Sequence, residues 1–551
     1  MCLASGRIIS LMVINQNYYQ LSNIGLYLWS AILLLQASAI AAPEELISET
    51  GFSGGLVVHV GAADTKLVQQ LVAGNKNSVV QVLLKDNVAK TRKELHEQKL
   101  LGRVFADSWD GSHLPQVDAS VNLMIVESPI EMREIQRALA PGGTALIKNK
   151  SEWEEVTQPR PKEIDDWTHY LYDPSNNPVS KDTKVAPPKH MQWWAPPLYS
   201  RTHEIESSVP VVVTAGGKIV YIVDEGLTGI IDKRLPETWM LVGRDAFSGV
   251  QLWKRPLTNW GWPEWRPERA KRPFNVQDYS ESKPPVTLPR RLVMNDIHAF
   301  VTLGWTARVS MLDVATGKTV ATFDGTEGTE EILLRDGILY LAVSTEPGNR
   351  KSNRFVLTLD TTTKAVLWKS KTYNIQNEMF AVQGEHLYFQ TQTDLHCLNR
   401  NTGEIKWKFS VKADNSGYFG AKDGLLATER AVYITGRTWK PRSTKLLAID
   451  PQSGKLLWEK SKGFVSSAGG NPANVFEIDG VAWGALGAKS DFTGLDARTG
   501  KVIKTLDPKD TISQHHHIRC FRGKATSNYL LWPYRGTEFL DLAGDKHSRH
   551  D

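Results

Sequence analysis

The chain has 551 residues, of which 41% are hydrophobic and 23% are charged, and its formal net charge is +5. A single hydrophobic core rarely serves more than about 250–300 residues, so the length predicts more than one domain, and the composition excludes a disordered chain. The small net charge, with no concentrated basic segment, argues against nucleic-acid binding. Three cysteines, none in a C-x-x-C pair, are too few for a disulfide framework and indicate neither a zinc nor a redox site.

Residues 1–42 are predicted to be a signal peptide. The apolar stretch "IGLYLWSAILLL" (24–35) has the length of a signal-peptide core and is short for a membrane span. The small residues of "QASAIAAPEE" follow it, as they do at a cleavage site. We therefore expect an exported protein of the periplasm or cell envelope. The alternatives are an uncleaved anchor and a cytoplasmic protein whose start is misassigned.

Residues 52–150 alternate between strand and helix patterns. The runs "GLVVHV", "SVVQVLL" and "VNLMIV" have the continuous apolar character of buried strands, and each is followed by a helical pattern. This alternation predicts a doubly wound, Rossmann-like α/β domain with a mainly parallel sheet.

The same stretch resembles class I S-adenosylmethionine-dependent methyltransferases in its first loop, in "WDGSHLP" (109–115) and in "RALAPGGTALI" (137–147). The resemblance implies that Gly61 and Asp64 belong to the cofactor loop. However, the family's G-x-G-x-G is here "GAADT", and "LLK" replaces the acid expected after the second strand. Side chains at glycine positions prevent close backbone approach, and an exported protein would not meet that cofactor. We expect an inactive domain kept for structure or binding.

Residues 151–209 are predicted to form an irregular joint packed on the following domain, because they are rich in proline, aromatic and turn-forming residues. The blocks "DDWTHYLYDP" and "PPLYSRTHE" are similar to a group of bacterial envelope proteins that fuse a methyltransferase-like domain to a propeller.

Residues 210–551 contain a repeated turn. An Asp or Asn is followed four residues later by glycine and eight residues later by tryptophan, as in Asp450, Gly454 and Trp458. The acid accepts backbone N–H bonds and glycine adopts the positive φ that closes the turn, while the flanking apolar runs suit short strands. A multi-stranded unit that recurs every 40–50 residues or so predicts a β-propeller, with the tryptophan filling the space between blades.

The repeat "LAIDPQSGKLLW" (447–458) resembles the pyrroloquinoline-quinone-like (PQQ-like) repeat of quinoprotein dehydrogenases and outer-membrane assembly lipoproteins. The resemblance implies an all-β propeller of about six to eight four-stranded blades. Quinoprotein dehydrogenases carry an adjacent cysteine pair beside their cofactor, and this sequence has no such pair. We therefore expect no quinone, and we assign no cofactor.

An insertion after the first turn, residues 254–291, places three tryptophans among prolines and basic residues. Tryptophan rings and arginine forks suit sugar rings and acidic groups. The candidate ligand-binding residues are Trp260, Trp262, Trp265 and Arg266. The alternative is that these tryptophans cap the propeller.

Polar residues also cluster in the joint and in "SQHHHIRCFRG" near the end of the chain. Inner strands of a propeller converge on a central channel, so residues from distant repeats can meet there. The candidate residues for a catalytic or anion site at the channel are His169, Arg201, His203, Glu204, His516, His517 and Arg519. The alternative is hydrogen-bonded surface histidines, and we assign no metal.

Six turns are identifiable, and residues 528–551 indicate only the beginning of a seventh blade. We therefore expect a truncated propeller, with the product of a neighbouring reading frame as a candidate partner that completes it. The favoured function is an exported scaffold whose propeller binds a polysaccharide or an envelope protein. The alternatives are an enzyme of unassigned type that uses the His/Arg residues and an active methyltransferase.

Overall fold

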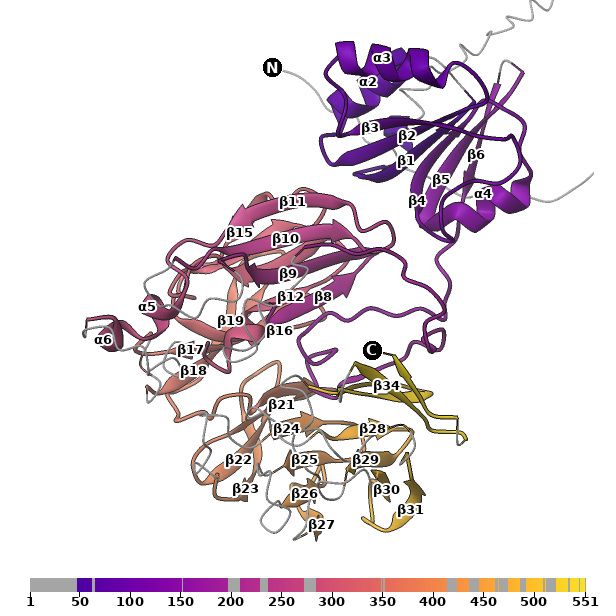
Figure 1. The fold of residues 1–551 in the computed structure, drawn as a ribbon. Coiled ribbons are helices and arrows are strands. Elements are labelled where there is room, and N and C mark those ends of the chain that lie inside the picture. The colour runs from indigo at the N-terminus through magenta and orange to yellow at the C-terminus, as the bar shows by residue number, and fades with distance from the viewer. Residues whose placement is uncertain are drawn as a thin grey trace, which may run out of the picture. The chain divides into compact units, whose positions relative to one another are not determined.

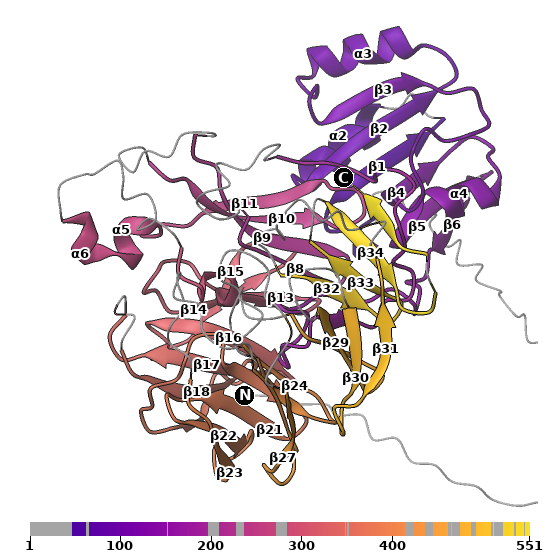
Figure 2. The same cartoon turned by 60° about the horizontal axis from the view of Figure 1, so that its bottom comes forward.

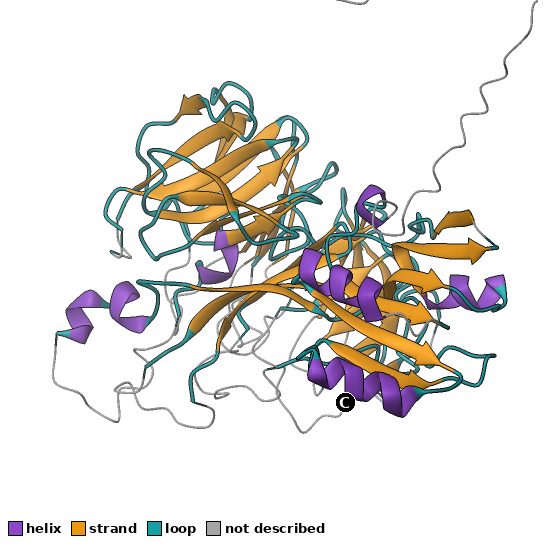
Figure 3. Ribbon diagram, turned by 90° about the horizontal axis from the view of Figure 1, so that it is seen from above, coloured by secondary structure: helices purple, strands orange, loops and turns teal. Residues whose placement is uncertain are grey.

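The computed structural model describes residues 47–61, 65–150, 152–196, 209–227, 236–271, 284–347, 349, 352–413, 424–435, 445–460, 464, 474–485, 492–508, 511, 522–533, 536–544 and 546–550. They form an α/β domain and seven antiparallel sheets (Figure 1). Most helices belong to the α/β domain, and strands dominate the rest of the described chain (Figure 3).

The α/β domain is built on a six-stranded sheet in the order β3-β2-β1-β4-β5-β6. Five strands are parallel, and the last pairs antiparallel with its neighbour. Its elements are β1 (Gly55–Val60), α2 (Thr65–Gly74), β2 (Ser78–Leu84), α3 (Val88–Glu97), β3 (Val104–Ser108), β4 (Val121–Val126), α4 (Met132–Ala138), β5 (Leu139–Asn149) and β6 (Glu152–Thr157). The alternation expected over 52–150 is present, and the sheet continues to residue 157. The strands read as apolar runs because residues on both of their faces are buried.

Seven sheets of four consecutive strands follow, and we number them blades 1 to 7 (Figure 2). Blade 1 contains β8 (Val211–Ala215), β9 (Lys218–Asp224), β10 (Trp239–Asp245) and β11 (Gln251–Pro256); blade 2, β12 (Leu292–Met294), β13 (His298–Thr302), β14 (Val309–Asp313) and β15 (Thr319–Thr322); blade 3, β16 (Thr329–Arg335), β17 (Ile338–Ser344), β18 (Arg354–Asp360) and β19 (Val366–Lys369); blade 4, β20 (Phe380–Gln383), β21 (His386–Gln390), β22 (Asp394–Asn399) and β23 (Ile405–Ser410).

Blade 5 contains β24 (Gly424–Ala427), β25 (Val432–Thr435), β26 (Leu446–Ile449) and β27 (Leu456–Lys460); blade 6, β28 (Phe476–Ile478), β29 (Val481–Ala485), β30 (Phe492–Asp496) and β31 (Val502–Leu506); blade 7, β32 (Lys524–Thr526), β33 (Tyr529–Trp532), β34 (Thr537–Asp541) and β35 (Ser548–His550). The strand β7 (Val179–Ser180) of the joint pairs parallel with β32. Between β11 and β12 lie α5 (Trp262–Trp265), α6 (Pro267–Ala270) and the 3-10 helix η2 (Leu288–Arg291).

The propeller prediction is confirmed, with seven blades. The expectation that residues 528–551 form only the beginning of a blade is wrong, because residues 524–550 form four paired strands. The last of these strands has no Asp–Gly–Trp turn to announce it, so the sequence pattern missed the hairpin.

The tryptophan of one blade packs on the glycine turn of the next. Trp407 donates its indole N–H to the carbonyl of Pro451 at 3.0 Å, and its ring covers Gly454, where an added Cβ would lie 2.6 Å from the ring. Gly454 also has a φ of +69°, so this position requires glycine for both backbone and space. The same pair of contacts is made by Trp253 with Val314 and Gly317, by Trp368 with Arg400 and Gly403, and by Trp458 with Ala497 and Gly500. We call these four residues the motif tryptophans.

Two of the three blades without the tryptophan, blades 2 and 6, show how a change in this residue is matched on the next blade. Blade 2 has Ala321 at this position, so no ring presses on the turn of blade 3, and there Lys364 with φ +63° stands in place of glycine. Blade 6 has Lys504, whose ammonium donates to the carbonyl of Leu542 at 2.7 Å. That carbonyl follows the turn acid Asp541 by one residue, as in the other interfaces.

Residues ahead of blade 1 join it to blade 7. Trp193 of the joint donates its indole N–H to the carbonyl of Ala246 at 2.9 Å, and its ring lies over Gly249, which repeats the contacts of a motif tryptophan. Trp167 pairs with Thr214 on β8, and the ammonium of Lys524 on β32 lies 4.7 Å from the centroid of the Trp167 ring. The joint therefore links the last blade to the first.

Candidate functional site at the loop face of the propeller

The connections between blades reach one face of the propeller. In a four-stranded antiparallel blade, the turn from the second to the third strand and the connection to the next blade leave from the same end of the sheet. We call this end the loop face, and the insertion with α5, α6 and η2 belongs to it. The candidates Arg201, His203, Glu204, His516, His517 and Arg519 lie outside the described residues. They precede β8 or β32, whose first residues lie at the loop face.

Residues 165–180, which we call the inner segment, pass the first strand of every blade in ring order. The first strand has an inward edge that no strand of its own blade can pair. One N–H from each blade finds an acceptor on the inner segment, at 2.8–3.0 Å. The donors are Thr214, Met294, Leu334, Val382, Ala427, Glu477 and Ala525, and their acceptors are the carbonyls of Trp167 and Thr168, Nε2 of His169, the carbonyls of Pro174 and Ser175, Oδ1 of Asn177 and the carbonyl of Pro178.

His169 is the one imidazole in this series. Its Nε2 accepts the N–H of Leu334 at 3.0 Å, which assigns the ring proton to Nδ1, 2.7 Å from Oγ1 of Thr168. Burial, together with the smaller effect of the nearby charge of Arg290, lowers the pKa of His169 to about 3, so the ring is neutral. Both ring nitrogens are engaged. His169 therefore has a structural role: it joins the inner segment to blade 3. Neither of its nitrogens is free to bind a metal ion or to abstract a proton.

Arg290 anchors the inner segment to blades 2, 3 and 4. Its Nε donates to Oε2 of Glu331 at 2.5 Å, and its Nη2 donates to Oδ1 of Asn176 and to the carbonyl of Phe380, both at 2.9 Å. The amide of Asn176 in turn donates to the carbonyls of Phe380 and Leu425. A buried ion pair of this kind is retained more for specificity of assembly than for net stability.

Two further arginines lie at the loop-face end of the ring. Nε of Arg354 donates to Oε2 of Glu330 at 2.6 Å, and Nε of Arg522 donates to Oδ1 of Asn474 at 3.0 Å. Arg522 is buried, and burial lowers its pKa. Arg354 is thus paired with a carboxylate, as Arg290 is.

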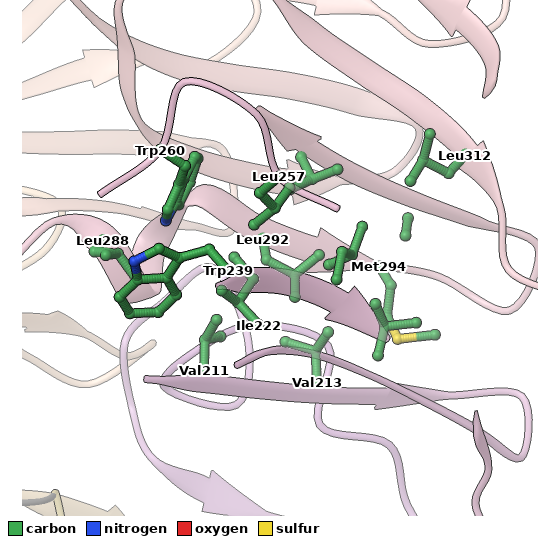
Figure 4. Close-up of a cluster of buried hydrophobic side chains, with 14 of the residues drawn as sticks. Val211, Val213, Ile222, Trp239, Leu257, Trp260, Leu288, Leu292, Met294 and Leu312 are labelled. Atoms are coloured by element: carbon green, nitrogen blue, oxygen red, sulfur yellow. The ribbon is translucent and has the colours of Figure 1, made fainter. Parts of the chain in front are cut away.

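Four tryptophans outside the repeated turn form a second buried group, which we call the Trp cluster. Trp239 opens β10, Trp260 and Trp265 belong to the insertion, and Trp305 follows β13. Their rings meet edge to face, with centroids 5.8 Å apart for Trp239–Trp265, 5.6 Å for Trp265–Trp305 and 5.7 Å for Trp260–Trp305. Leu257 and Leu288 belong to the same apolar core (Figure 4).

The indole N–H groups of the Trp cluster are buried without acceptors. All four side chains are at most 8% exposed, and none of their Nε1 atoms has a hydrogen-bond partner within the part of the chain that the structure describes. Figure 4 shows the nitrogen-bearing edges of Trp239 and Trp260 turned toward each other. Leaving one buried donor unpaired costs about 1–3 kcal/mol, so four of them form an expensive arrangement for packing alone.

Arg291 adds a cation to this cluster. It is 1% exposed, and its guanidinium carbon lies 3.6 Å from the centroid of the Trp305 ring and 6.0 Å from that of Trp260. Nη1 donates to the carbonyl of Trp305 at 2.7 Å and lies 3.4 Å from Oγ1 of Thr302.

No described carboxylate lies within ion-pair distance of this guanidinium. Among the described residues Arg291 forms no ion pair, and its Nε has no hydrogen-bond partner. Burial lowers its pKa to about 10, against the opposing effect of Glu330, which is itself bonded to Arg354. A desolvated cation–π contact stabilises by about 2 kcal/mol, whereas burial of a cation costs several kcal/mol.

The structure buries two of the three tryptophans that the insertion contributes as candidates. Trp260 and Trp265 belong to the buried Trp cluster, and ligand contact by them stays a prediction. Trp262 is half-buried, and its backbone N–H donates to Oε2 of Glu237 at 2.8 Å. Arg266 is half-buried directly after α5. Ligand contact by Trp262 and Arg266 stays a prediction.

The methyltransferase-like loop is described only in part. Gly61 directly follows β1 and has a φ of +92°, and a Cβ there would lie 1.9 Å from Oγ of Ser128, so glycine is required for packing. Asp64 lies outside the described residues. Lys85 follows β2 where the family has its acid, and its Nζ lies 5.5 Å from the centroid of the Trp109 ring. An ammonium cannot accept hydrogen bonds from ribose hydroxyls.

Sequence reasoning missed Arg291, Trp239 and Trp305 as parts of one site. The available signal was that these tryptophans do not follow the spacing of the repeated turn. Their meeting depends on contacts between blades 1 and 2, which the pattern does not contain.

Two further properties concern the described residues. No helix among them is long and apolar enough to cross a membrane. No group of three His, Cys, Asp or Glu side chains is arranged to hold a metal ion in the described part of the chain.

Part of the propeller matches a known protein family. Residues 306–514 match the family model described as outer membrane protein assembly factor BamB, PQQ_2. The propeller is therefore PQQ-like over the matched residues, which run from β14 of blade 2 to the end of blade 6. No curated protein matches the sequence significantly.

Several solved structures are similar at low identity. A europium-containing methanol dehydrogenase is 10% identical over 70% of this chain and 85% of its own, with a TM-score of 0.43. The quinohemoprotein alcohol dehydrogenase ADHIIG from Pseudomonas putida HK5 is 14% identical over 39% of this chain and 41% of its own, with a TM-score of 0.26. Geranyl diphosphate C-methyltransferase from Streptomyces coelicolor A3(2) is 15% identical over 19% and 43%, with a TM-score of 0.17. These values are too low to transfer an activity.

Proposed function

We propose that this chain is an exported cell-envelope scaffold whose propeller binds an acidic polysaccharide on its loop face, and that its α/β domain is an inactive methyltransferase relative. Export is supported by the apolar stretch 24–35. The matched family's description as an outer membrane assembly factor supports the same compartment.

The binding role is supported mainly by the difference between the centre of the ring, which the inner segment lines, and the loop face, which carries the insertion. The inner segment lies along the inner edge of all seven blades, so the centre of the ring is used by the chain itself. The loop face carries the insertion, with half-buried Trp262 and Arg266 and exposed Lys271. An aromatic face and a cation suit the ring and the carboxylate of an acidic sugar. A rigid ring that positions variable loops is a common design for a binding protein.

The residue that follows β2, Lys85, supports the proposal that the α/β domain is inactive. Lys85 occupies the position at which the resembling family holds the ribose, and Lys85 offers only donors. Calorimetry with S-adenosylmethionine is expected to show no heat of binding, and micromolar affinity would contradict this part of the proposal.

A glycan array tests the binding role. The chain is compared with Trp262→Ala and with the matched control Trp194→Ala, because Trp194 is a 66% exposed tryptophan of the joint. Loss of a stacked aromatic should weaken binding of acidic glycans about tenfold or more in Trp262→Ala only. Equal retention of all three proteins by every glycan would contradict the polysaccharide. Capture of a specific envelope protein through the loop face would replace the polysaccharide with a protein partner.

A further inference from the structure

The loop-face end of blades 1 and 2 presents buried hydrogen-bond donors that have no acceptor among the described residues. The Trp cluster supplies four unpaired indole N–H groups, and Arg291 supplies an unpaired Nε–H together with its charge. A group that enters this site must therefore offer acceptors. A sugar hydroxyl or a water molecule can accept a hydrogen bond but brings no negative charge to oppose Arg291. An anion supplies both the acceptor atoms and the negative charge.

The neighbouring arginine shows that this is a property of the position and not of the chain's arginines in general. Arg290 points to Glu331 and Asn176 and uses both in close hydrogen bonds. Arg291, one residue later, points instead between Trp305 and Trp260. Glu237, two residues before β10, accepts the backbone N–H of Trp262 of the insertion.

We propose that Arg291 and the Trp cluster bind an oxyanion group, a carboxylate, sulfate or phosphate, at the loop-face end of blades 1 and 2. This inference rests on the proposed function, since an acidic polysaccharide carries such groups, and it names the site that receives them. Arginine and indole N–H groups place directed donors around the anion, and the surrounding rings keep water away, which strengthens each bond.

The test uses the full-length protein labelled with ¹⁵N-tryptophan, whose indole N–H resonances report hydrogen bonding one ring at a time. Trp→Phe variants assign the signals of the Trp cluster and of the motif tryptophans. Sodium sulfate, inorganic phosphate, acetate and an oligogalacturonate are titrated separately at constant ionic strength. We expect a saturable shift of the signals of the Trp cluster with at least one of them, and no shift of the motif signals, because their N–H groups are already bonded.

Two variants separate the site from general charge effects. Arg291→Met should lose the anion-induced shift. Arg308→Gln, which removes an exposed arginine three residues after Trp305, should keep it. The motif signals report whether Arg291→Met is folded. If they move, Arg291→Lys replaces it, and loss of the planar fork should weaken anion binding about tenfold.

The outcomes are distinct. No saturable shift with any probe, or the same shift in Arg291→Met, overturns the site. A shift with small anions but none with the oligogalacturonate supports the site and contradicts the acidic polysaccharide. Oligogalacturonate binding that Arg291→Met leaves unchanged supports the proposed function and overturns this inference.

Discussion

The motif tryptophans and the Trp cluster use the same side chain in opposite ways. Each motif tryptophan covers a glycine of the next blade and donates its N–H to a carbonyl at 2.8–3.0 Å. The tryptophans of the Trp cluster are at most 8% exposed, like Trp253 and Trp458 of the motif group, but their N–H groups have no acceptor in the described chain. Burial alone therefore does not distinguish a structural tryptophan from a candidate ligand-binding one. The distinction is whether the indole N–H has a hydrogen-bond acceptor within the protein.

The largest expected effect is loss of a motif tryptophan. Trp458→Ala removes a buried ring and its bond to Ala497, which should lower the free energy of unfolding by about 3–5 kcal/mol. Native-state hydrogen exchange of β26 to β31 measures it, with Trp194→Ala as an exposed control expected to change stability by less than about 0.5 kcal/mol. Unchanged exchange in Trp458→Ala would show that these rings do not hold the blades together.

Exchanging the residue at the positive-φ position of the turn tests whether glycine is needed only where a tryptophan ring covers it. Gly454→Ala places a Cβ against Trp407 at a positive φ, which should destabilise by about 2–4 kcal/mol from strain and overpacking together. The partner variant, Lys364→Gly, changes the one turn that faces Ala321 and should stay within about 1 kcal/mol of the parent. Thermal unfolding compares the two, and equal losses would contradict the pairing of ring and glycine.

The inner segment contains a buried titratable group, the imidazole of His169, whose ring nitrogens are both hydrogen-bonded. Between the ordinary pKa of 6.5 and about 3, the unfolded chain binds a proton at His169 that the folded chain does not. Stability from this group is therefore complete above pH 6.5 and falls as the pH drops, by about 1.4 kcal/mol per pH unit. His169→Gln keeps an acceptor for Leu334 and should remove this slope. Denaturant titrations of both proteins from pH 7 to pH 4 measure the difference, and identical slopes would contradict the assignment.

The smallest expected effect compares the two kinds of tryptophan directly. Trp458→Phe loses a satisfied hydrogen bond, whereas Trp260→Phe removes a donor that is unpaired, so in anion-free buffer Trp260→Phe should cost about 1 kcal/mol less. Thermal unfolding in buffer without sulfate, phosphate or carboxylate measures it. Equal costs would indicate that the indole N–H of Trp260 is bonded in solution.

The propeller could be predicted from sequence because its evidence is local. Acid, glycine and tryptophan recur at fixed spacing, and even the exceptions are intelligible: Lys364 lacks a facing ring, and Lys504 supplies a donor where the indole is missing. The seventh blade was misjudged because its final hairpin, at β34 and β35, does not use that turn. The insertion was identified as special, but its sequence did not show that two of its three tryptophans are buried.

The sequence by itself determined the α/β alternation, the repeated blades and the packing of the motif tryptophans, because turn chemistry and side-chain period act over a few residues. Only the tertiary structure decided which N–H groups find acceptors. The inner segment pairs with strands up to about 350 residues away, Trp193 takes the place of a blade's tryptophan, and Arg291 comes to lie against Trp305 without a carboxylate. Such partners are set by ring geometry, in which neighbours in space are distant in sequence, and no local pattern records them.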